Sequence, residues 1–120
     1  MGFKFEKLKI WQTALELSGE ISNMMKQFPK DELFVLISQI KRAADSVVLN
    51  ITEGSTSHSN TEFKRFLVIA NRSAPEVIGC LYLAKQRTYI TEEFFKEKYN
   101  KYEKLTVMIQ ALIKSLDNEE

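Results

Sequence analysis

Apolar residues recur every three or four positions along almost the whole chain, a spacing typical of amphipathic helices. Four such segments are predicted: residues 6–28, residues 31–53, a third opening at Ser59 whose apolar stripe reaches Ala84, and a fourth over residues 91–116. Only short connections separate them, so neighbouring helices should be antiparallel. The pattern predicts an all-α, up-down-up-down four-helix bundle in which residues 1–120 form a single domain.

The predicted helix boundaries rest on local chemistry. Phe28 precedes a proline and is therefore pushed out of helical geometry, which should end the first helix. Gly54 is expected to end the second helix, since glycine commonly follows the last helical residue. Ser59 and Glu62 have the spacing of a capping box, which should open the third helix.

The third and fourth helices carry further signals. Pro75 lies inside the third helical pattern and is expected to kink it, because proline removes a backbone hydrogen bond. Gly79, one turn later, could allow close packing. Thr91 is the expected N-cap of the fourth helix, and residues 117–120 are expected to be a frayed tail.

A polar stripe follows each arm of the hairpin between residues 39 and 76. Its members are Gln39, Arg42, Ser46, Asn50 and Glu53 on the first arm and Glu62, Arg65, Ser73 and Glu76 on the second. Folding the chain at His58 would place the stripes opposite each other. Apolar residues flank both stripes, so we expect at least partly buried ion pairs between Arg42 and Glu76 and between Glu53 and Arg65. Loss of such a pair in Arg42→Ala should cost roughly 3 to 5 kcal/mol.

The helices carry more apolar residues than one bundle interior requires. Those outside the main stripes are Phe34, Val35, Leu49, Val68, Ile78 and Leu83, together with a second strip on the first helix. A continuous exposed apolar band is typical of an interface. The pattern therefore indicates a homo-oligomer.

Composition narrows the class of protein. The 120 residues are 44% hydrophobic and 28% charged, as in a soluble globular protein. The single cysteine, Cys80, excludes an internal disulfide and fits a reducing compartment. No apolar run is as long as a membrane span, and the first residues lack the apolar segment of a signal peptide. We therefore expect a cytoplasmic protein without a membrane partner.

The sequence offers no catalytic or metal-binding constellation. Its one histidine, His58, lies in a turn, whereas the di-iron sites of helical bundles use Glu-x-x-His pairs. Cys80 lies on an apolar face, where a buried inert thiol is expected. Glu53 and Glu62 lie near Arg65, which favours a structural ion network over an acid–base pair. We expect no enzyme activity, no metal and no cofactor.

Charge is distributed unevenly although the net charge is only +1. Residues 59–89 carry five basic and two acidic side chains, whereas residues 90–120 carry five basic and seven acidic ones. A basic strip attracts phosphates regardless of base sequence. The candidate phosphate contacts are Lys41, Lys64, Arg72, Lys85 and Arg87. The alternative is an ordinary solvated helix face.

Three segments carry a family resemblance. They are residues 36–44 (Leu-Ile-Ser-Gln-Ile-Lys-Arg-Ala-Ala), residues 50–54 (Asn-Ile-Thr-Glu-Gly), and Glu62-Phe63 with Phe66-Leu67. With these motifs at this separation, the chain resembles the bacterial four-helix bundle proteins encoded in intervening sequences of 23S ribosomal RNA genes. Accessory proteins of diversity-generating retroelements are similar to the same group.

The resemblance implies a ring-like homopentamer and makes binding of RNA, DNA or a reverse transcriptase plausible. The chain departs from the family pattern at Lys41-Arg42-Ala43, where Arg-Arg-Ala is usual, and at Arg72-Ser73, where Gly-Ser is usual. It is also less basic than the retroelement accessory proteins.

Three hypotheses on function remain. The leading one is a non-enzymatic homo-oligomer that assists a nucleic acid or ribonucleoprotein. The second is an oligomeric scaffold that binds a protein partner. The third is an enzyme, for which the sequence contains no recognised catalytic set.

Overall fold

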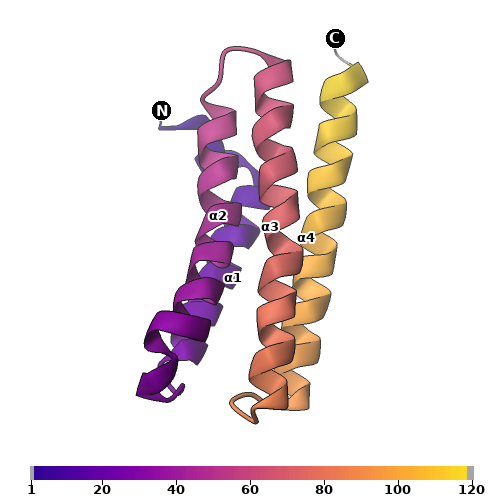
Figure 1. Ribbon diagram of the computed structural model, residues 1–120. Helices are drawn as coiled ribbons and strands as arrows, with labels where there is room; N and C mark the ends of the chain where they lie inside the picture. The colour runs from indigo at the N-terminus through magenta and orange to yellow at the C-terminus, as the bar shows by residue number, and fades with distance from the viewer. Residues whose placement is uncertain (1, 119–120) are drawn as a thin grey trace.

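The computed structural model describes residues 2–118 and contains four long helices. They are α1 (Lys9–Met25), α2 (Ser38–Ser55), α3 (Asn60–Gln86) and α4 (Glu92–Asn118). Consecutive helices run antiparallel, and α1 lies behind α2 in Figure 1. The bundle measures 47 × 23 × 23 Å. The predicted all-α, up-down-up-down architecture is confirmed.

The core forms where the four apolar stripes meet. Leu17 of α1, Ile40 of α2, Leu67 of α3 and Leu105 of α4 are each at most 1% exposed. Helices α2 and α3 make the most extensive contact in the bundle. The apolar periodicity of the sequence therefore identified the buried side of each helix, because burial of one helical face is what stabilises the bundle.

The first helix is shorter than the sequence pattern predicted. A 3-10 turn, η1 (Lys4–Lys7), precedes α1, and α1 ends at Met25 rather than at Phe28. Phe28 is nevertheless buried, and the centroid of its ring lies 5.0 Å from that of Tyr89. The chain leaves the helix early because Phe28 packs on the turn between α3 and α4.

The second helical segment is not uniform. A 3-10 turn, η2 (Lys30–Glu32), leads into a π-helical turn, η3 (Leu33–Ile37), and α2 begins only at Ser38. A π-helical turn accommodates one extra residue and so rotates the preceding side chains relative to the helix. Phe34 is consequently 89% exposed, while Leu36 is buried. The prediction of a regular helix from residue 31 was wrong in this detail.

Gly54 does not end α2, which continues to Ser55. A Cβ at Gly54 would lie 2.8 Å from the Cβ of Phe66 and 2.9 Å from Cδ1 of Phe63. The glycine therefore allows α3 to approach α2 closely. Close packing was predicted at Gly79 instead, where a Cβ would meet nothing within 4 Å. That prediction was wrong, because close packing depends on which side of the helix faces a neighbour.

The two predicted N-caps, Ser59 and Thr91, are confirmed. Ser59 caps α3 by accepting a hydrogen bond from the N–H of Glu62 at 3.1 Å, and Thr91 caps α4 by accepting one from the N–H of Phe94 at 3.0 Å. Helix α3 is continuous through Pro75. The expected frayed tail was wrong for Asp117 and Asn118, which belong to α4; residues 119 and 120 lie outside the described residues.

Among the described residues, α3 is the one helix long and apolar enough to cross a membrane by length and composition, with a mean hydropathy of 1.2. It is also a core helix of this bundle, and its side chains at Leu67, Val77 and Leu81 are fully buried between the other helices. A core helix passes the same length and composition test, so this finding is weak support for a membrane span.

Candidate interaction surfaces

The hairpin of α2 and α3 has the predicted register. The hydroxyl groups of Ser46 and Ser73 are 2.8 Å apart, and the side-chain amide of Asn50 donates to the Ser46 hydroxyl at 3.0 Å. Gly54 meets Phe66 about two helical turns from the Ser46–Ser73 contact. Three members of the predicted polar stripe therefore form a hydrogen-bonded centre between the two helices.

The predicted ion pairs do not form. No ion pair among residues 2–118 joins Arg42 to Glu76 or Glu53 to Arg65. All four side chains are exposed rather than partly buried. Long charged side chains at an exposed position remain hydrated and gain little from pairing. The large stability cost expected for Arg42→Ala therefore has no structural basis within one chain.

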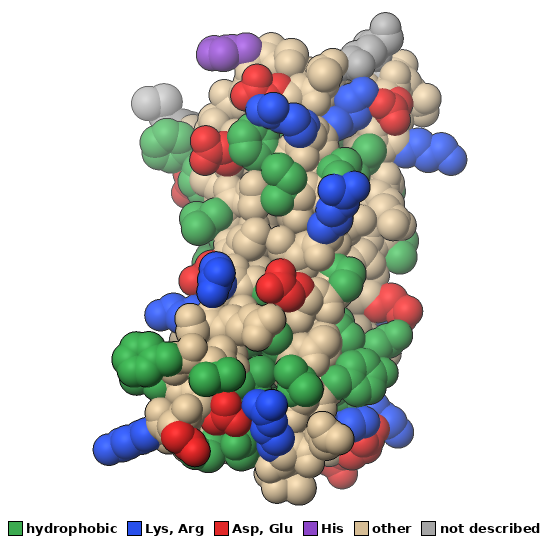
Figure 2. Space-filling model, in the orientation of Figure 1, with side chains coloured by type: hydrophobic (Ala, Val, Ile, Leu, Met, Phe, Trp, Pro, Cys, Tyr) green, Lys and Arg blue, Asp and Glu red, His purple; other side chains and the backbone are tan. Residues whose placement is uncertain are grey.

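The exposed surface along this hairpin, which we call the α2/α3 face, combines charged and apolar side chains. It consists of Gln39, Arg42, Leu49 and Glu53 on α2 and Glu62, Arg65, Ile69, Arg72, Glu76 and Leu83 on α3. Three arginines and three glutamates make it neutral. Leu49, Ile69 and Leu83 are 62%, 42% and 39% exposed. Figure 2 shows apolar side chains interspersed with both charges on this side.

The five candidate phosphate contacts do not form one strip. Lys64 pairs with Asp117 and Lys85 with Glu92, both on α4, and Lys85 also lies over the ring of Phe95. Arg87 pairs with Glu32. Three of the five candidates therefore have a carboxylate partner.

The other two candidates, Lys41 and Arg72, are exposed and have no ion pair among residues 2–118. Lys41 lies beside the groove between α1 and α2, close to Asp45. Arg72 belongs to the α2/α3 face. The two cations therefore lie on different sides of α2.

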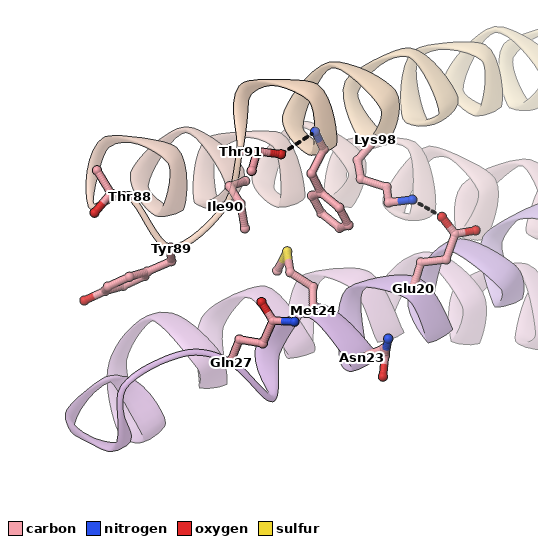
Figure 3. Close-up of a pocket in the computed structure, with 10 residues that line it drawn as sticks. Glu20, Asn23, Met24, Gln27, Thr88, Tyr89, Ile90, Thr91 and Lys98 are labelled. Carbon is pink, nitrogen blue, oxygen red and sulfur yellow. Dashed lines mark hydrogen bonds and ion pairs between the residues drawn. The ribbon is translucent and has the colours of Figure 1, made fainter.

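A polar hollow of about 370 Å³ lies between the second half of α1 and the start of α4. The turn between α3 and α4 closes one end of it (Figure 3). Lys98 forms one wall and is only 3% exposed. Its ammonium group bonds to Glu20 and to Glu97 and lies 4.7 Å from the ring centroid of Phe94.

The burial of Lys98 was not predicted, although the sequence contained a signal for it. The core positions of α4 run through Phe95, Tyr102, Leu105 and Ile109, and residue 98 is the one position of this helical repeat that is not apolar. A lysine in an apolar repeat indicates a buried charge that needs a partner. The partner, Glu20, is 78 residues away in the sequence, so no local pattern could identify it.

A second cluster that was not predicted joins η2 to the turn between α3 and α4, at the same end of the bundle. The hydroxyl of Tyr89 donates to Glu32 at 2.8 Å, and the guanidinium of Arg87 donates to the same carboxylate oxygen at 3.0 Å. The hydrogen bond to the Glu32 carboxylate raises the pKa of Tyr89 above its usual value. This cluster anchors η2 to the turn that precedes α4.

The residues considered for chemistry lie apart from one another. Cys80 is a free thiol in the core, and burial, with a smaller contribution from the charge of Glu76, raises its pKa. His58 is exposed in the turn between α2 and α3. Within residues 2–118, no three histidine, cysteine, aspartate or glutamate side chains are grouped as metal ligands would be.

Comparison with known proteins places the chain in a family. A solved structure similar to it is that of a protein of unknown function from the S23 ribosomal protein family of Bacteroides thetaiotaomicron. The two are 28% identical with a TM-score of 0.80, over 88% of this chain and 98% of the other. No curated protein matches the chain. The family model of the 23S rRNA-intervening sequence protein matches residues 6–111, and the chain therefore belongs to that family.

Proposed function

We propose that the protein is a non-enzymatic assembly module of the cytoplasm that associates with copies of itself through the α2/α3 face. The observation that carries this proposal is the mixture of exposed apolar side chains and unpaired charges on that face. Apolar side chains exposed in a row are typical of an interface. The arginines and glutamates of this face could pair with opposite charges on a different face of a second copy, the head-to-tail contact that a ring requires.

The charges on this face support association rather than stability of the single chain. Arg42 and Arg65 have no ion pair among residues 2–118, although Glu76 and Glu53 lie at matching levels of the hairpin. A partner surface would exclude water around them, which strengthens charge pairing. The stoichiometry we expect is the homopentamer that the family resemblance implies.

The mass of the protein in solution tests this proposal. We expect a species of about five times the 13.9 kDa chain mass. Leu49→Asp and Ile69→Asp should shift it towards monomer, because each places a charge in the apolar part of the interface. Circular dichroism should be unchanged, since both side chains are exposed.

Val107→Asp is the matched control for these two variants. Val107 is 59% exposed and lies on α4, away from the α2/α3 face. The assembly should therefore tolerate this substitution. A monomeric wild type, or a control that dissociates as readily as Ile69→Asp, would contradict the proposal.

A second candidate function is binding of nucleic acid by the assembled protein. Lys41 and Arg72 support it, since both are exposed cations without a carboxylate partner among residues 2–118. Lys41 lies outside the α2/α3 face, whereas Arg72 lies on it and could contact phosphates in the assembly only from the rim of the interface. The family description also associates related genes with 23S ribosomal RNA. An oligomer would repeat these cations and strengthen the attraction of phosphates. A reverse transcriptase remains the protein partner that the resemblance suggests.

Binding to structured RNA and to duplex DNA across a salt series tests this candidate. Affinity should fall steeply as salt rises, because phosphate contacts release counterions. Lys41→Glu and Arg72→Glu should weaken binding, whereas Lys114→Glu, an exposed change on α4, should not. The mass of Arg72→Glu should be measured alongside. Binding that is insensitive to salt, or equally weakened by all three variants, would favour a scaffold with a protein partner.

A further inference from the structure

The polar hollow between α1 and α4 has the size and lining of a small-ligand site. Its volume of about 370 Å³ falls within the range of roughly 300 to 1,000 Å³ that is usual for ligand pockets. Figure 3 shows Met24 of α1, and Gln27 from the turn just after α1, on the side that faces Ile90 and Thr91, with the Lys98–Glu20 pair to one side. Three elements, α1, the α3–α4 turn and α4, therefore contribute its walls.

One wall presents a hydrogen-bonding edge. Asn23 lies in the last turn of α1 and Gln27 in the turn just after it, and both line the hollow. Each carboxamide offers a donor and an acceptor side by side. No hydrogen bond from residues 2–118 reaches either side-chain amide. Both amides are thus available to a ligand that carries an adjacent donor and acceptor.

The floor of the hollow is apolar. Met24 is only 7% exposed, and Ile90 and Phe94 are partly buried against the core. Phe94 also supplies an aromatic ring on which a flat ligand could stack, with the Lys98 ammonium 4.7 Å from the ring centroid. This combination of an apolar floor and a polar edge suits a planar heterocycle.

The charges on the wall of the hollow are balanced. Lys98 is paired with Glu20 and Glu97, and Lys101 pairs with the same two carboxylates. Lys98, the one cation among the residues that line the hollow, is therefore already compensated and gives a phosphate group no advantage over an uncharged ring.

We propose that this hollow binds an adenine base. Adenine presents the N6 amino donor next to the N7 acceptor, the edge that an asparagine or glutamine side chain pairs with through two hydrogen bonds. Its ring would lie over the apolar floor that Met24 and Phe94 form, as single-stranded bases stack on aromatic side chains. The base could belong to a free nucleoside or to an unpaired nucleotide of an RNA strand.

Titration of the ¹⁵N-labelled protein with adenosine tests the proposal. The side-chain amide signals of Asn23 and Gln27 should move and saturate. Inosine replaces the amino group by an oxo group and should bind roughly tenfold more weakly, the discrimination typical of one bidentate contact. Ribose should cause no shift. Hexa-adenylate distinguishes the sources, since tighter binding than adenosine assigns the site to a strand and equal or weaker binding to a nucleoside.

Gln27→Met and Gln110→Met form a matched pair of variants. Both glutamines are exposed. Gln27 lies just after α1, whereas Gln110 lies within α4 and outside the hollow. Gln27→Met should weaken adenosine binding roughly tenfold, and Gln110→Met should leave it unchanged. The proposal is overturned by absence of shifts at millimolar adenosine, by equal shifts with ribose or inosine, or by equal binding of the two variants. Larger shifts with an uncharged tripeptide would assign the hollow to a peptide and also overturn it.

Discussion

Single residues in this protein derive their roles from the space around them. Gly54 and Gly79 are both helical glycines, yet only Gly54 faces another helix closely. Likewise Arg42 and Lys98 both occur beside apolar residues, yet Arg42 is exposed and Lys98 is 3% exposed. The two members of each pair are alike in chemistry and in local pattern, so only the neighbouring helix distinguishes them.

Gly54→Ala should destabilise the fold. The added Cβ would lie within 3.0 Å of both Phe66 and Phe63, so the helices must move apart, at a cost of about 1 to 3 kcal/mol for overpacking. Gly79→Ala is the control, and it should stabilise by up to about 1 kcal/mol because alanine favours a helix and the site is open. Urea denaturation measures both. Equal effects at the two sites would contradict the packing role of Gly54.

At the scale of elements, the starts of α3 and α4 followed from the sequence, whereas the start of α2 and the end of α1 did not. The caps Ser59 and Thr91 act on their own first turns, so a local motif suffices to identify them. The end of α3 is also formed by a local motif, but Thr88 takes the position at which glycine is usual. The N–H of Tyr89 bonds to the carbonyl of Ala84 and the N–H of Thr88 to that of Lys85, the two bonds of a Schellman motif.

Thr88→Gly should therefore stabilise α3. Thr88 has a φ of 61°, a left-handed conformation that costs a non-glycine residue roughly 1 to 2 kcal/mol. Glycine adopts this conformation without that cost, so we expect a gain of about 1 kcal/mol in the free energy of unfolding. Thermal and urea unfolding should agree. Thr106→Gly, inside α4, is the control and should be destabilising; a loss of stability in Thr88→Gly would refute the expectation.

At the scale of the whole molecule, the bundle closes where the first helix meets the last. A charge cluster at this contact joins Glu20 of α1 to Lys98 and Lys101 of α4, and both lysines also pair with Glu97. The pKa of Glu97 is lowered below its usual 4.5. The largest cause is the hydrogen bond from Lys98, followed by the charge of Lys98 and then by the hydrogen bond and charge of Lys101. The free energy of unfolding is therefore linked to the ionisation of Glu97.

This coupling predicts a loss of stability in acid. Below the usual pKa of 4.5 the unfolded chain binds a proton at Glu97 while the folded chain does not. Stability should be fully present above that pH and fall as the pH drops through the lowered folded pKa. Glu97→Gln should flatten this part of the urea stability profile between pH 5 and pH 3, a window of roughly two units around the shift. Glu93→Gln, a carboxylate without an ion pair among residues 2–118, should not flatten it; identical profiles for both variants would count against the coupling.

The sequence by itself determined the helical class, the number of long helices, their order, and the register of the α2–α3 hairpin. These features depend on periodicity and capping, which are properties of neighbouring residues along the chain. Only the tertiary structure decided which charges are buried. Arg42 and Glu53, predicted to form buried ion pairs, are exposed. Lys98 is buried against Glu20, and Lys41 lies apart from Arg72. Burial and pairing depend on residues far apart in the sequence, so no local pattern contains them.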